Sequence, residues 1–158
     1  MAIVYLALGS NLDMPRRQLT NALKHLQSFP RTYILARSKI YLTKPFGIKA
    51  QPNYLNMVVA IKTSLSPHAL LIACKKTEKK QCRIRKKIWG ARSIDIDILL
   101  YEQKVIQQKG LTVPHPQLLL RDFVLVPLLE ISPNQCLPCG QKILFTRETT
   151  QTIMGCRL

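Results

Sequence analysis

Residues 89–101, WGARSIDIDILLY, constrain the fold more than any other stretch of the chain, because they place two carboxylates inside an apolar strand. A strand turns every second residue to the same face, so Asp95 and Asp97 project together while the isoleucines around them face the other way. Their Cα atoms would lie roughly 6.5 Å apart. Burying two like charges without partners would cost several kcal/mol, so we expect a cation to hold them.

Two interpretations of this pair stay open on the motif alone. In the first, the strand lies at a sheet edge, its carboxylates meet water and Arg92 bridges Asp95. In the second, the pair binds a divalent metal, because hard carboxylate oxygens suit Mg²⁺, which keeps some waters and usually shares itself with substrate phosphates. Two carboxylates on one face would hold one ion, or two ions about 3.5–4 Å apart.

A basic run just before the aspartates favours phosphate chemistry. Such a run is ordinarily a solvated face. Here it adjoins the proposed metal site and contains a glycine and the only tryptophan of the chain, Trp89. Arginine side chains match phosphate oxygens bidentately and would neutralise the charge that develops during phosphoryl transfer. The cations of this run are Arg83, Arg85, Lys86, Lys87 and Arg92.

Length and charge narrow the class of protein. A chain of 158 residues predicts a single domain over residues 1–158, and an apolar fraction of 47% predicts a compact core. Twenty-four Lys and Arg residues face eight Asp and Glu residues, a formal net charge of +16. That imbalance implies a polyanionic partner: nucleic acid, a phosphorylated small molecule or an acidic membrane surface.

The five cysteines and the N-terminal sequence predict a reduced, cytoplasmic protein. The apolar start has no basic region and stops at Gly9, which is too early for a signal peptide. No apolar run approaches the roughly 18 residues of a spanning helix, so we expect no membrane partner. Cys136 and Cys139 form an isolated Cys-x-x-Cys pair, which we interpret as two reduced thiols in preference to a redox or zinc site.

Hydrophobic periodicity predicts strands at residues 3–8, 32–42, 54–64 and around the aspartates. Helices are expected at residues 14–29 and 66–81, the second with Ser66 as N-cap and Pro67 in its first turn. A short helical piece, the apolar FVLVPLLEI and a polar tail then follow. This order predicts an α/β (α+β) fold, a ferredoxin-like split βαβ sandwich whose mixed, mostly antiparallel sheet has helices on its faces.

Three other residues bear on the chemistry. The chain has no GxxxxGK[ST] phosphate loop, so it is not a P-loop enzyme. Two prolines fix the backbone around His115, whose imidazole would either cap a turn or contact phosphate. Arg121 and Phe123 follow closely, and a phenylalanine there is by itself more typical of a core than of a stacking surface.

Seven motifs follow one another along the chain: GSN (9–11), TKPFG (43–47), QPNYLN (51–56), RIR (83–85), WGARSIDIDIL (89–99), LTVPHP (111–116) and RDFVLVPL (121–128). Together they resemble the 6-hydroxymethyl-7,8-dihydropterin pyrophosphokinases of folate synthesis, and the resemblance extends from residue 3 to about residue 135. The Asp-x-Asp and Pro-His-Pro blocks are specific in combination, and the others are supportive.

The resemblance implies a ferredoxin-like fold and transfer of pyrophosphate from ATP to the hydroxymethyl group of the reduced pterin, with release of AMP. Asp95 and Asp97 would bind two Mg²⁺ ions, and Arg83 and Arg92 would contact the phosphates. No His or Glu is placed beside the attacking hydroxyl by the motifs. Metal polarisation and in-line positioning, without a dedicated general base, are therefore expected to drive the reaction.

The resemblance also implies the two substrate sites. Tyr54 and Phe123 would sandwich the pterin ring, while Thr43, Asn56 and the backbone near Phe46 would contact its polar edge. A flat ring rich in donors and acceptors needs such aromatic faces and in-plane amides. The ATP site would include Glu78, Arg85, Trp89, Ile98, Thr112, His115 and Arg121, of which Arg85 and Trp89 would help to close a loop over both substrates.

Four residues depart from the family pattern. Cys82 replaces a common Gly before the Arg-x-Arg pair, Ile88 a usual basic residue, Ala91 a frequent Pro, and Gly110 an Arg that some members place near ATP. None is a metal or pterin residue. We therefore expect them to change loop details and nucleotide affinity and not the reaction.

Two rival functions make different predictions. A basic ferredoxin-like RNA-binding module would need stacking aromatics clustered on its sheet, and no segment reads as such a strand. A nucleotide-sugar transferase would also use Asp-x-Asp, but no Rossmann half is recognisable in this short chain. We therefore predict ATP and the pterin as partners, no nucleic acid, and a monomer.

Overall fold

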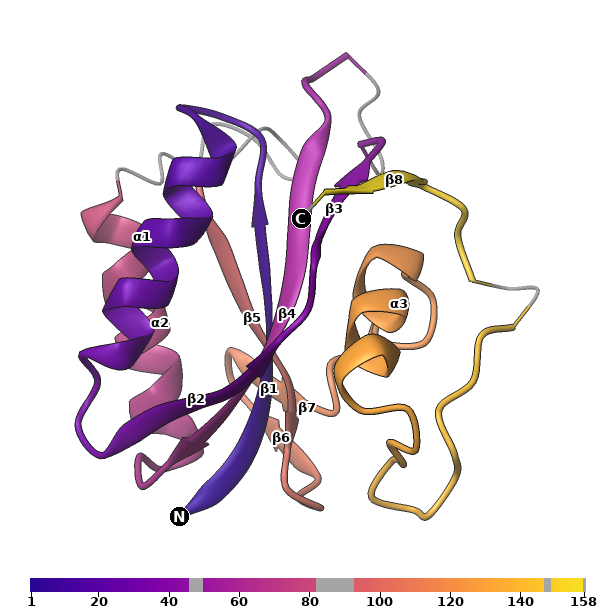
Figure 1. Cartoon of the computed structure of the whole chain (residues 1–158). Helices are drawn as coiled ribbons and strands as arrows, with labels where there is room; N and C mark the ends of the chain where they lie inside the picture. Colours follow the sequence, from indigo (N-terminus) through magenta and orange to yellow (C-terminus); the bar gives the residue numbers. More distant parts are fainter. Residues whose placement is uncertain (46–49, 82–92, 147–148, 158) are drawn as a thin grey trace.

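The computed structural model describes residues 1–45, 50–81, 93–146 and 149–157. Within these residues the chain forms an α/β structure with helices on both faces of a sheet (Figure 1). In chain order the elements are β1 (Ala2–Ser10), α1 (Pro15–Gln27), β2 (Thr32–Arg37), β3 (Ile40–Thr43), β4 (Tyr54–Thr63), α2 (Pro67–Lys80), β5 (Asp95–Tyr101), β6 (Ile106–Gln108), β7 (Leu111–Val113), α3 (Asp122–Ile131) and β8 (Ile153–Arg157).

The sheet has the strand order of a split βαβ fold. Its strands run β5-β1-β4-β3-β8, with β2 also paired to β4, so β4 lies between β1 and the strands that follow α1. Every pairing among the described strands is antiparallel, including the separate β6–β7 hairpin. The predicted ferredoxin-like sandwich is confirmed, with a sheet more uniformly antiparallel than the mixed one expected.

Helices α1 and α2 cover one face of the sheet (Figure 1). Leu19, Ala22 and Leu26 recur at helical spacing on α1 and are fully buried against the sheet. Helix α2 begins as predicted, because the Ser66 hydroxyl accepts a hydrogen bond from the backbone N–H of Ala69 at 3.3 Å. Both N-terminal turns contain a proline, which needs no N–H partner there.

Helix α3 covers the opposite face (Figure 1). It corresponds to the apolar FVLVPLLEI, so the helix is the apolar segment itself and not a short piece before it. Val124, Leu125 and Leu128 pack on Val58 and Leu99 of the sheet to form a second core. The sheet is therefore buried on both faces over much of its length, which explains why its strands read as nearly continuous apolar runs.

Two strands differ from the sequence prediction. The strand expected at residues 32–42 is divided, because the Ser38 hydroxyl accepts from Val58 N at 3.0 Å and donates to Lys39 O at 2.8 Å, which interrupts the regular ladder. The polar tail, to which the sequence assigned no element, contains a strand: residues 153–157 form β8 and extend the sheet beyond β3. The edge of the main sheet beyond β3 is thus formed by the C-terminal strand β8.

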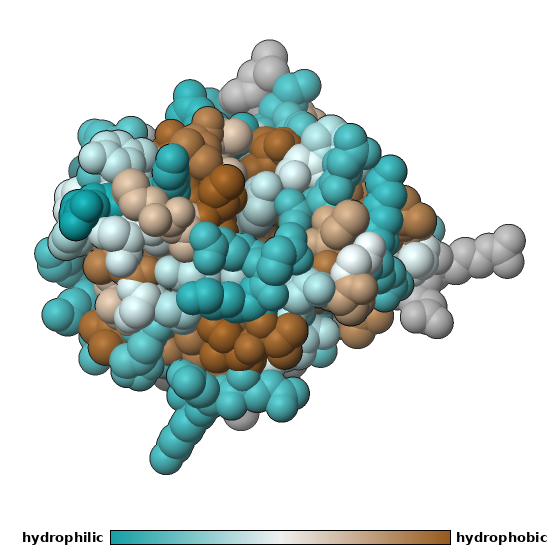
Figure 2. Space-filling view, turned by 90° about the horizontal axis from the view of Figure 1, so that it is seen from below, coloured by the Kyte–Doolittle hydropathy of each residue, from teal (hydrophilic) through white to brown (hydrophobic). Residues whose placement is uncertain are grey.

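The surface is consistent with the composition. Figure 2 shows the end of the molecule where the N-terminus lies, with hydrophilic side chains over much of it and hydrophobic patches between them. In the described part of the chain, we find no helix with the length and hydrophobicity required to span a bilayer.

Candidate active site

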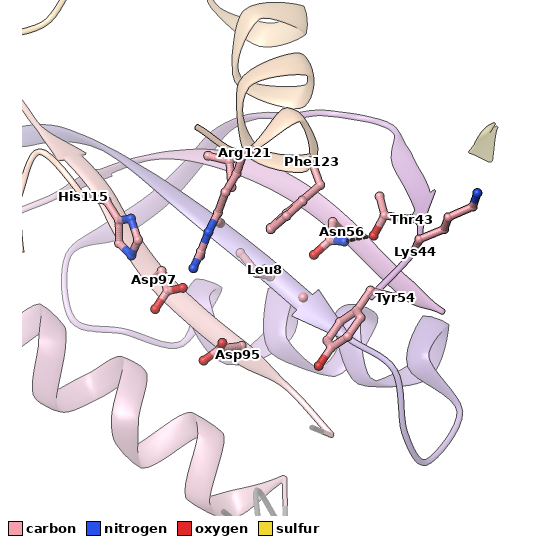
Figure 3. Close-up of a pocket in the computed structure, with 13 residues that line it drawn as sticks. Leu8, Thr43, Lys44, Tyr54, Asn56, Asp95, Asp97, His115, Arg121 and Phe123 are labelled. Carbon is pink, nitrogen blue, oxygen red and sulfur yellow. Dashed lines mark hydrogen bonds between the residues drawn. The ribbon is translucent and has the colours of Figure 1, made fainter. Parts of the chain in front are cut away.

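A cavity of about 270 Å³ opens on the face of the sheet that α3 only partly covers (Figure 3). Residues from β1, β3, β4 and β5 form its floor, and the start of α3 forms one wall. The lining residues are Ala7, Leu8, Gly9, Thr43, Lys44, Tyr54, Asn56, Asp95, Asp97, His115, Arg121, Phe123 and Val124.

The hollow arises from small residues on the central strand. On the α3 side of β1, Tyr5 packs against the α3 core, whereas Ala7 and Gly9 leave space. Gly9 pairs with Asp95 on one side and with Asn56 on the other. A Cβ at Gly9 would stand 2.7 Å from the Asn56 Oδ1 atom. The absence of a side chain at Gly9 therefore leaves the space on β1 that the Asn56 amide occupies.

Asp95 and Asp97 lie on the cavity side of β5, as the strand periodicity predicts. Both are half-buried and line the cavity, while Ile96 and Ile98 are buried against the opposite core. The strand is at the edge of the main sheet, as the solvated interpretation required, but its carboxylates face a cavity. The edge strand of the first interpretation and the grouped carboxylates of the second therefore occur together in β5.

The donor set at this end of the cavity fits Mg²⁺. Two carboxylates supply hard oxygen ligands, and the described residues contain no cluster of three or more His, Cys, Asp or Glu that would form a closed cage. A site with few protein ligands leaves coordination positions for water and phosphate oxygens, which is how Mg²⁺ is usually bound.

The backbone between the two aspartates is held from the other face of the sheet. The buried Glu78 of α2 accepts a hydrogen bond from the Ile96 N–H at 2.9 Å. At the start of the strand, the Ser10 hydroxyl donates to the Ser93 carbonyl, and the Ser93 hydroxyl donates to Asp13 Oδ2 at 3.3 Å. These contacts fix the strand segment that presents the carboxylates.

His115 both caps a turn and lines the cavity, so its two sequence interpretations are compatible. Its Nδ1 accepts from the Gln117 N–H at 3.1 Å, which leaves Nε2 to bear the proton. Burial, and to a smaller extent the positive charge of Arg121, lower the pKa of His115 to about 4, against an opposing effect of Asp95. The imidazole is therefore a neutral hydrogen-bond donor at neutral pH.

The other end of the cavity combines amide, hydroxyl and aromatic groups. The Asn56 amide donates to Thr43 Oγ1 at 2.6 Å, and both side chains are buried. Tyr54 and Phe123 project into this part of the cavity from β4 and α3 (Figure 3). The Arg121 guanidinium carbon lies 5.6 Å from the centroid of the Phe123 ring, a distance typical of cation–π contact.

The structure brings eight of the predicted site residues together around this cavity and places three elsewhere. Ile98 faces the core under α1 and α2, Thr112 is exposed on β7, and Glu78 bonds the strand backbone from behind. The predicted residues Phe46, Arg83, Arg85, Trp89 and Arg92, and the departures Cys82, Ile88 and Ala91, lie outside the described residues.

The sequence interpretation missed five lining residues: Ala7, Leu8, Gly9, Lys44 and Val124. The alternation of small residues in Ala7-x-Gly9 is a signal that would have found the floor, since a buried strand normally carries larger side chains. Gly110 also has a local explanation, because it adopts a positive φ of 83° in the turn between β6 and β7.

Comparisons with known proteins agree with this arrangement. A family model described as 7,8-dihydro-6-hydroxymethylpterin-pyrophosphokinase matches residues 5–133. A Haemophilus influenzae protein named 2-amino-4-hydroxy-6-hydroxymethyldihydropteridine pyrophosphokinase is 44% identical over 143 residues, which cover 90% of this chain and 89% of that protein. An Aquifex aeolicus protein of the same name is 45% identical over 160 residues, covering 100% and 99% of the two chains.

Solved structures agree on the fold. A crystal structure of an HPPK-DHPS chain in complex with substrates matches with a TM-score of 0.70 at 15% identity, over 90% of this chain and 42% of that one. Wild-type HPPK-DHPS from Plasmodium falciparum matches with a TM-score of 0.67 at 16% identity, over 90% and 43%. This chain thus spans less than half the length of those structures. By its sequence match, this chain belongs to the 7,8-dihydro-6-hydroxymethylpterin-pyrophosphokinase family.

Proposed function

We propose that this chain transfers pyrophosphate from ATP to the hydroxymethyl group of 6-hydroxymethyl-7,8-dihydropterin and releases AMP, a step of folate biosynthesis. The observation that supports this most is a single cavity with two different ends. One end presents the carboxylates of Asp95 and Asp97, and the other presents Asn56 between aromatic side chains. Family membership and the names of the relatives support the same reaction.

Asp95 and Asp97 would hold Mg²⁺, and we propose two ions, as the family resemblance implies. Bound there, Mg²⁺ would neutralise charge on the triphosphate and polarise the attacking hydroxyl. The chain contributes two carboxylates fixed on one strand face, with the amide between them bonded to Glu78. Their placement is set before substrate binds, so little reorganisation is needed on binding.

The pterin would occupy the end of the cavity lined by Tyr54, Asn56 and Phe123. Two ring systems offer apolar faces to a flat heterocycle, and the Asn56 amide offers both a donor and an acceptor to its edge. The Asn56–Thr43 hydrogen bond of 2.6 Å fixes the orientation of that amide. A pterin held this way would direct its hydroxymethyl group toward the aspartates.

The chemical step would then be an in-line attack. The pterin hydroxyl oxygen forms a bond to the β-phosphorus, the bond from that phosphorus to the oxygen bridging the α-phosphate breaks, and AMP leaves with that electron pair. The hydroxyl proton passes to solvent. His115 is neutral at pH 7 and bears its proton on Nε2, so it would donate to a phosphate oxygen and not act as the base.

Arg121 lies on the same side of the cavity and would bind the nucleotide phosphates. Its guanidinium is always protonated and offers a fork of donors that matches phosphate oxygens. Figure 3 shows it extending between His115 and Phe123 toward the carboxylates. A fixed cation at this position would attract the anionic nucleotide and offset charge that builds up on the phosphates.

We also propose that the chain acts as a cytoplasmic monomer on these small molecules and without nucleic acid. The described residues of this chain line both ends of the cavity, which supports a chain that works alone. Cys136 and Cys139 are free thiols, which fits a reducing compartment.

The test is a chromatographic assay with ATP, Mg²⁺ and 6-hydroxymethyl-7,8-dihydropterin that scores AMP against ADP. Pterin-dependent AMP is the expected product. ADP would retain the metal and phosphate site but contradict pyrophosphate transfer. No turnover together with no pterin binding by calorimetry would contradict the proposed function as a whole.

A further inference from the structure

Asp122 lies between two residues that line the cavity, Arg121 and Phe123, yet it is not a lining residue itself. Its side chain is only 2% exposed. A charged side chain so deeply buried needs several hydrogen bonds to offset the loss of water. The partners of this carboxylate therefore show what the start of α3 is attached to.

The partners lie in the C-terminal segment, apart from the N–H of Phe123, which donates to Asp122 Oδ1 at 2.9 Å. Asp122 Oδ1 accepts from the hydroxyls of Thr150 and Thr152 at 3.0 and 2.6 Å, and Oδ2 accepts from the backbone N–H groups of Thr152 and Ile153. The bond from Ile153 N is 2.8 Å long. Hydrogen bonds to a carboxylate are shorter and stronger than neutral ones. A single side chain thus fixes residues 150–153 to the first turn of α3.

The same residues are attached to the opposite wall of the cavity. The Lys44 N–H donates to the Thr152 carbonyl at 2.9 Å, and Thr43 pairs with Ile153 in the β3–β8 ladder. Thr43 is also the hydrogen-bond partner of Asn56. Residues 152–153 therefore connect the helix that presents Phe123 to the strand that positions the amide of Asn56.

We propose that Asp122 is a positioning residue that acts through residues 150–153, and that this C-terminal tie sets the width of the pterin end of the cavity. The inference rests on the proposed function. The family model matches residues 5–133 only, so residues 150–153 lie beyond the matched region. If the tie loosens, Phe123 and Asn56 are no longer held at a fixed separation, and pterin binding weakens more than turnover at saturation.

The first variant is Asp122→Asn. It keeps the volume of the side chain but replaces one accepting oxygen with an N–H₂ group, which in either amide orientation faces a backbone N–H: those of Thr152 and Ile153, or that of Phe123. We expect the Kd for pterin, measured by calorimetry, to rise about tenfold, because charge-assisted bonds are replaced by opposed donors. The kcat at saturating substrate is expected to change less than the Kd.

A matched control is available on the same helix. Glu130, near the other end of α3, also ties the helix to the β3 region, accepting from Lys39 N at 3.1 Å and from the Tyr41 hydroxyl at 2.9 Å. It lines no part of the cavity. Glu130 is exposed, and Glu130→Leu removes both of its accepting oxygens, so this variant breaks a link between α3 and the β3 region away from the cavity and is expected to leave the Kd for pterin within about twofold. An equal rise in both variants would overturn the inference.

A milder pair keeps the test decisive if Asp122→Asn fails to fold. Thr152→Val removes only the hydroxyl that bonds Asp122, whereas Thr152→Ser retains it. The valine variant should weaken pterin binding about threefold and the serine variant should restore it, because one hydrogen bond separates them. Equal affinities in the two variants would contradict a role for the tie.

Hydrogen exchange separates failure of this inference from failure of the proposed function. The Lys44 amide donates to Thr152 across the tie, so we expect it to exchange faster in Thr152→Val than in Thr152→Ser. If the parent chain forms no AMP and binds no pterin, the proposed function fails, and the exchange rates still decide whether the tie holds the wall. Equal protection of the Lys44 amide in the two variants would overturn the inference that residues 150–153 hold this wall of the cavity.

Discussion

The two ends of the cavity are held in place by different kinds of structure. At the carboxylate end, Asp95 and Asp97 stand in register with Gly9 and Ala7 of the antiparallel strand β1, so the regular ladder itself sets their spacing. At the helix end, Phe123 is placed by a buried carboxylate that reaches 28 to 31 residues along the chain. The first end is positioned by repeating geometry, and the second by one specific set of hydrogen bonds.

This difference has a functional consequence. A strand ladder distributes its stability over many backbone bonds, so a single side-chain change there alters chemistry without moving the strand. At the helix end, by contrast, one carboxylate makes the positioning hydrogen bonds. Loss of those bonds would therefore shift the side of the cavity that Phe123 lines. We therefore expect variants at the carboxylate end to affect catalysis and variants at the helix end to affect affinity.

The largest effect is expected from Asp97→Ala. Loss of one of two metal ligands should lower kcat by about 10³-fold or more. Thermal stability without metal should not fall, because the change also removes repulsion between two nearby carboxylates. Mg²⁺ with a nucleotide analogue should raise the Tm of the parent and not that of the variant.

Glu102→Gln is the matched control for that experiment. Glu102 is exposed, follows the other end of β5 and lies outside the cavity. It should leave both the rate and the Mg²⁺-dependent Tm shift at parent values. Near-normal AMP formation by Asp97→Ala would contradict the metal assignment of the carboxylate pair.

The carboxylate end was also the part that the sequence predicted best. Alternation in SIDIDILL is a local signal, and it indicated the shared face of Asp95 and Asp97 and the opposite, buried face of the isoleucines around them. The floor was missed, because Gly9 looks like an ordinary turn residue until the register places Asn56 against it. Local periodicity predicts which face of the sheet a side chain occupies. Its neighbour on the next strand is known only once the register of the two strands is known.

The helix end was predicted less completely for a related reason. Arg121 and Phe123 were found through the family resemblance, yet nothing local indicated that the Asp122 carboxylate would accept hydrogen bonds from the polar tail. Threonines at positions 150 and 152 have no motif, and their role depends on a contact between distant segments. The break of the strand at Ser38 is similar, because a hydroxyl competes with the ladder only in the folded context.

The second largest effect is expected in the pH dependence of the free energy of unfolding. Burial lowers the pKa of His115 to about 4 from 6.5, so the unfolded chain takes up a proton between these values that the folded chain does not. The free energy of unfolding should therefore fall by about 2–3 kcal/mol as the pH drops from about 6.5 to 4. Denaturant titrations over this range measure the loss.

His115→Asn isolates this contribution. An asparagine carbonyl is able to accept from Gln117 N–H as Nδ1 does, but it does not titrate. The variant should lose less stability than the parent between pH 6.5 and 4. Parallel curves for the two proteins would show that His115 is not the residue responsible.

Next in size is Gly9→Ala, which tests the floor between the two ends. The added Cβ would meet Asn56 Oδ1 at 2.7 Å, and Asn56 has little freedom to move because it is bonded to Thr43. We expect pterin affinity to fall about tenfold through displacement of that amide. Nucleotide affinity should change little.

Gly155→Ala provides the reference for this substitution. Gly155 is also a strand residue, but a Cβ there meets nothing within 4 Å. Calorimetry with pterin should give parent-like binding for Gly155→Ala. If both alanine variants bind pterin equally well, the close approach of Gly9 and Asn56 does not control the pterin end.

The smallest effect is expected from Glu78, which supports the carboxylate end from behind. Glu78→Gln retains an oxygen able to accept from Ile96 N–H, whereas Glu78→Leu leaves that amide without this acceptor. The leucine variant should need about threefold more Mg²⁺ for half-maximal rate, because the strand between the two ligands is less firmly held. The glutamine variant should stay near the parent, since the ladder fixes the rest of β5.

If instead the glutamine variant loses as much as the leucine variant, the negative charge of Glu78, and not its hydrogen bond, is what the metal site depends on. That result would sharpen the comparison, because the carboxylate end would then be tuned by a field from the far face of the sheet as well as by its register.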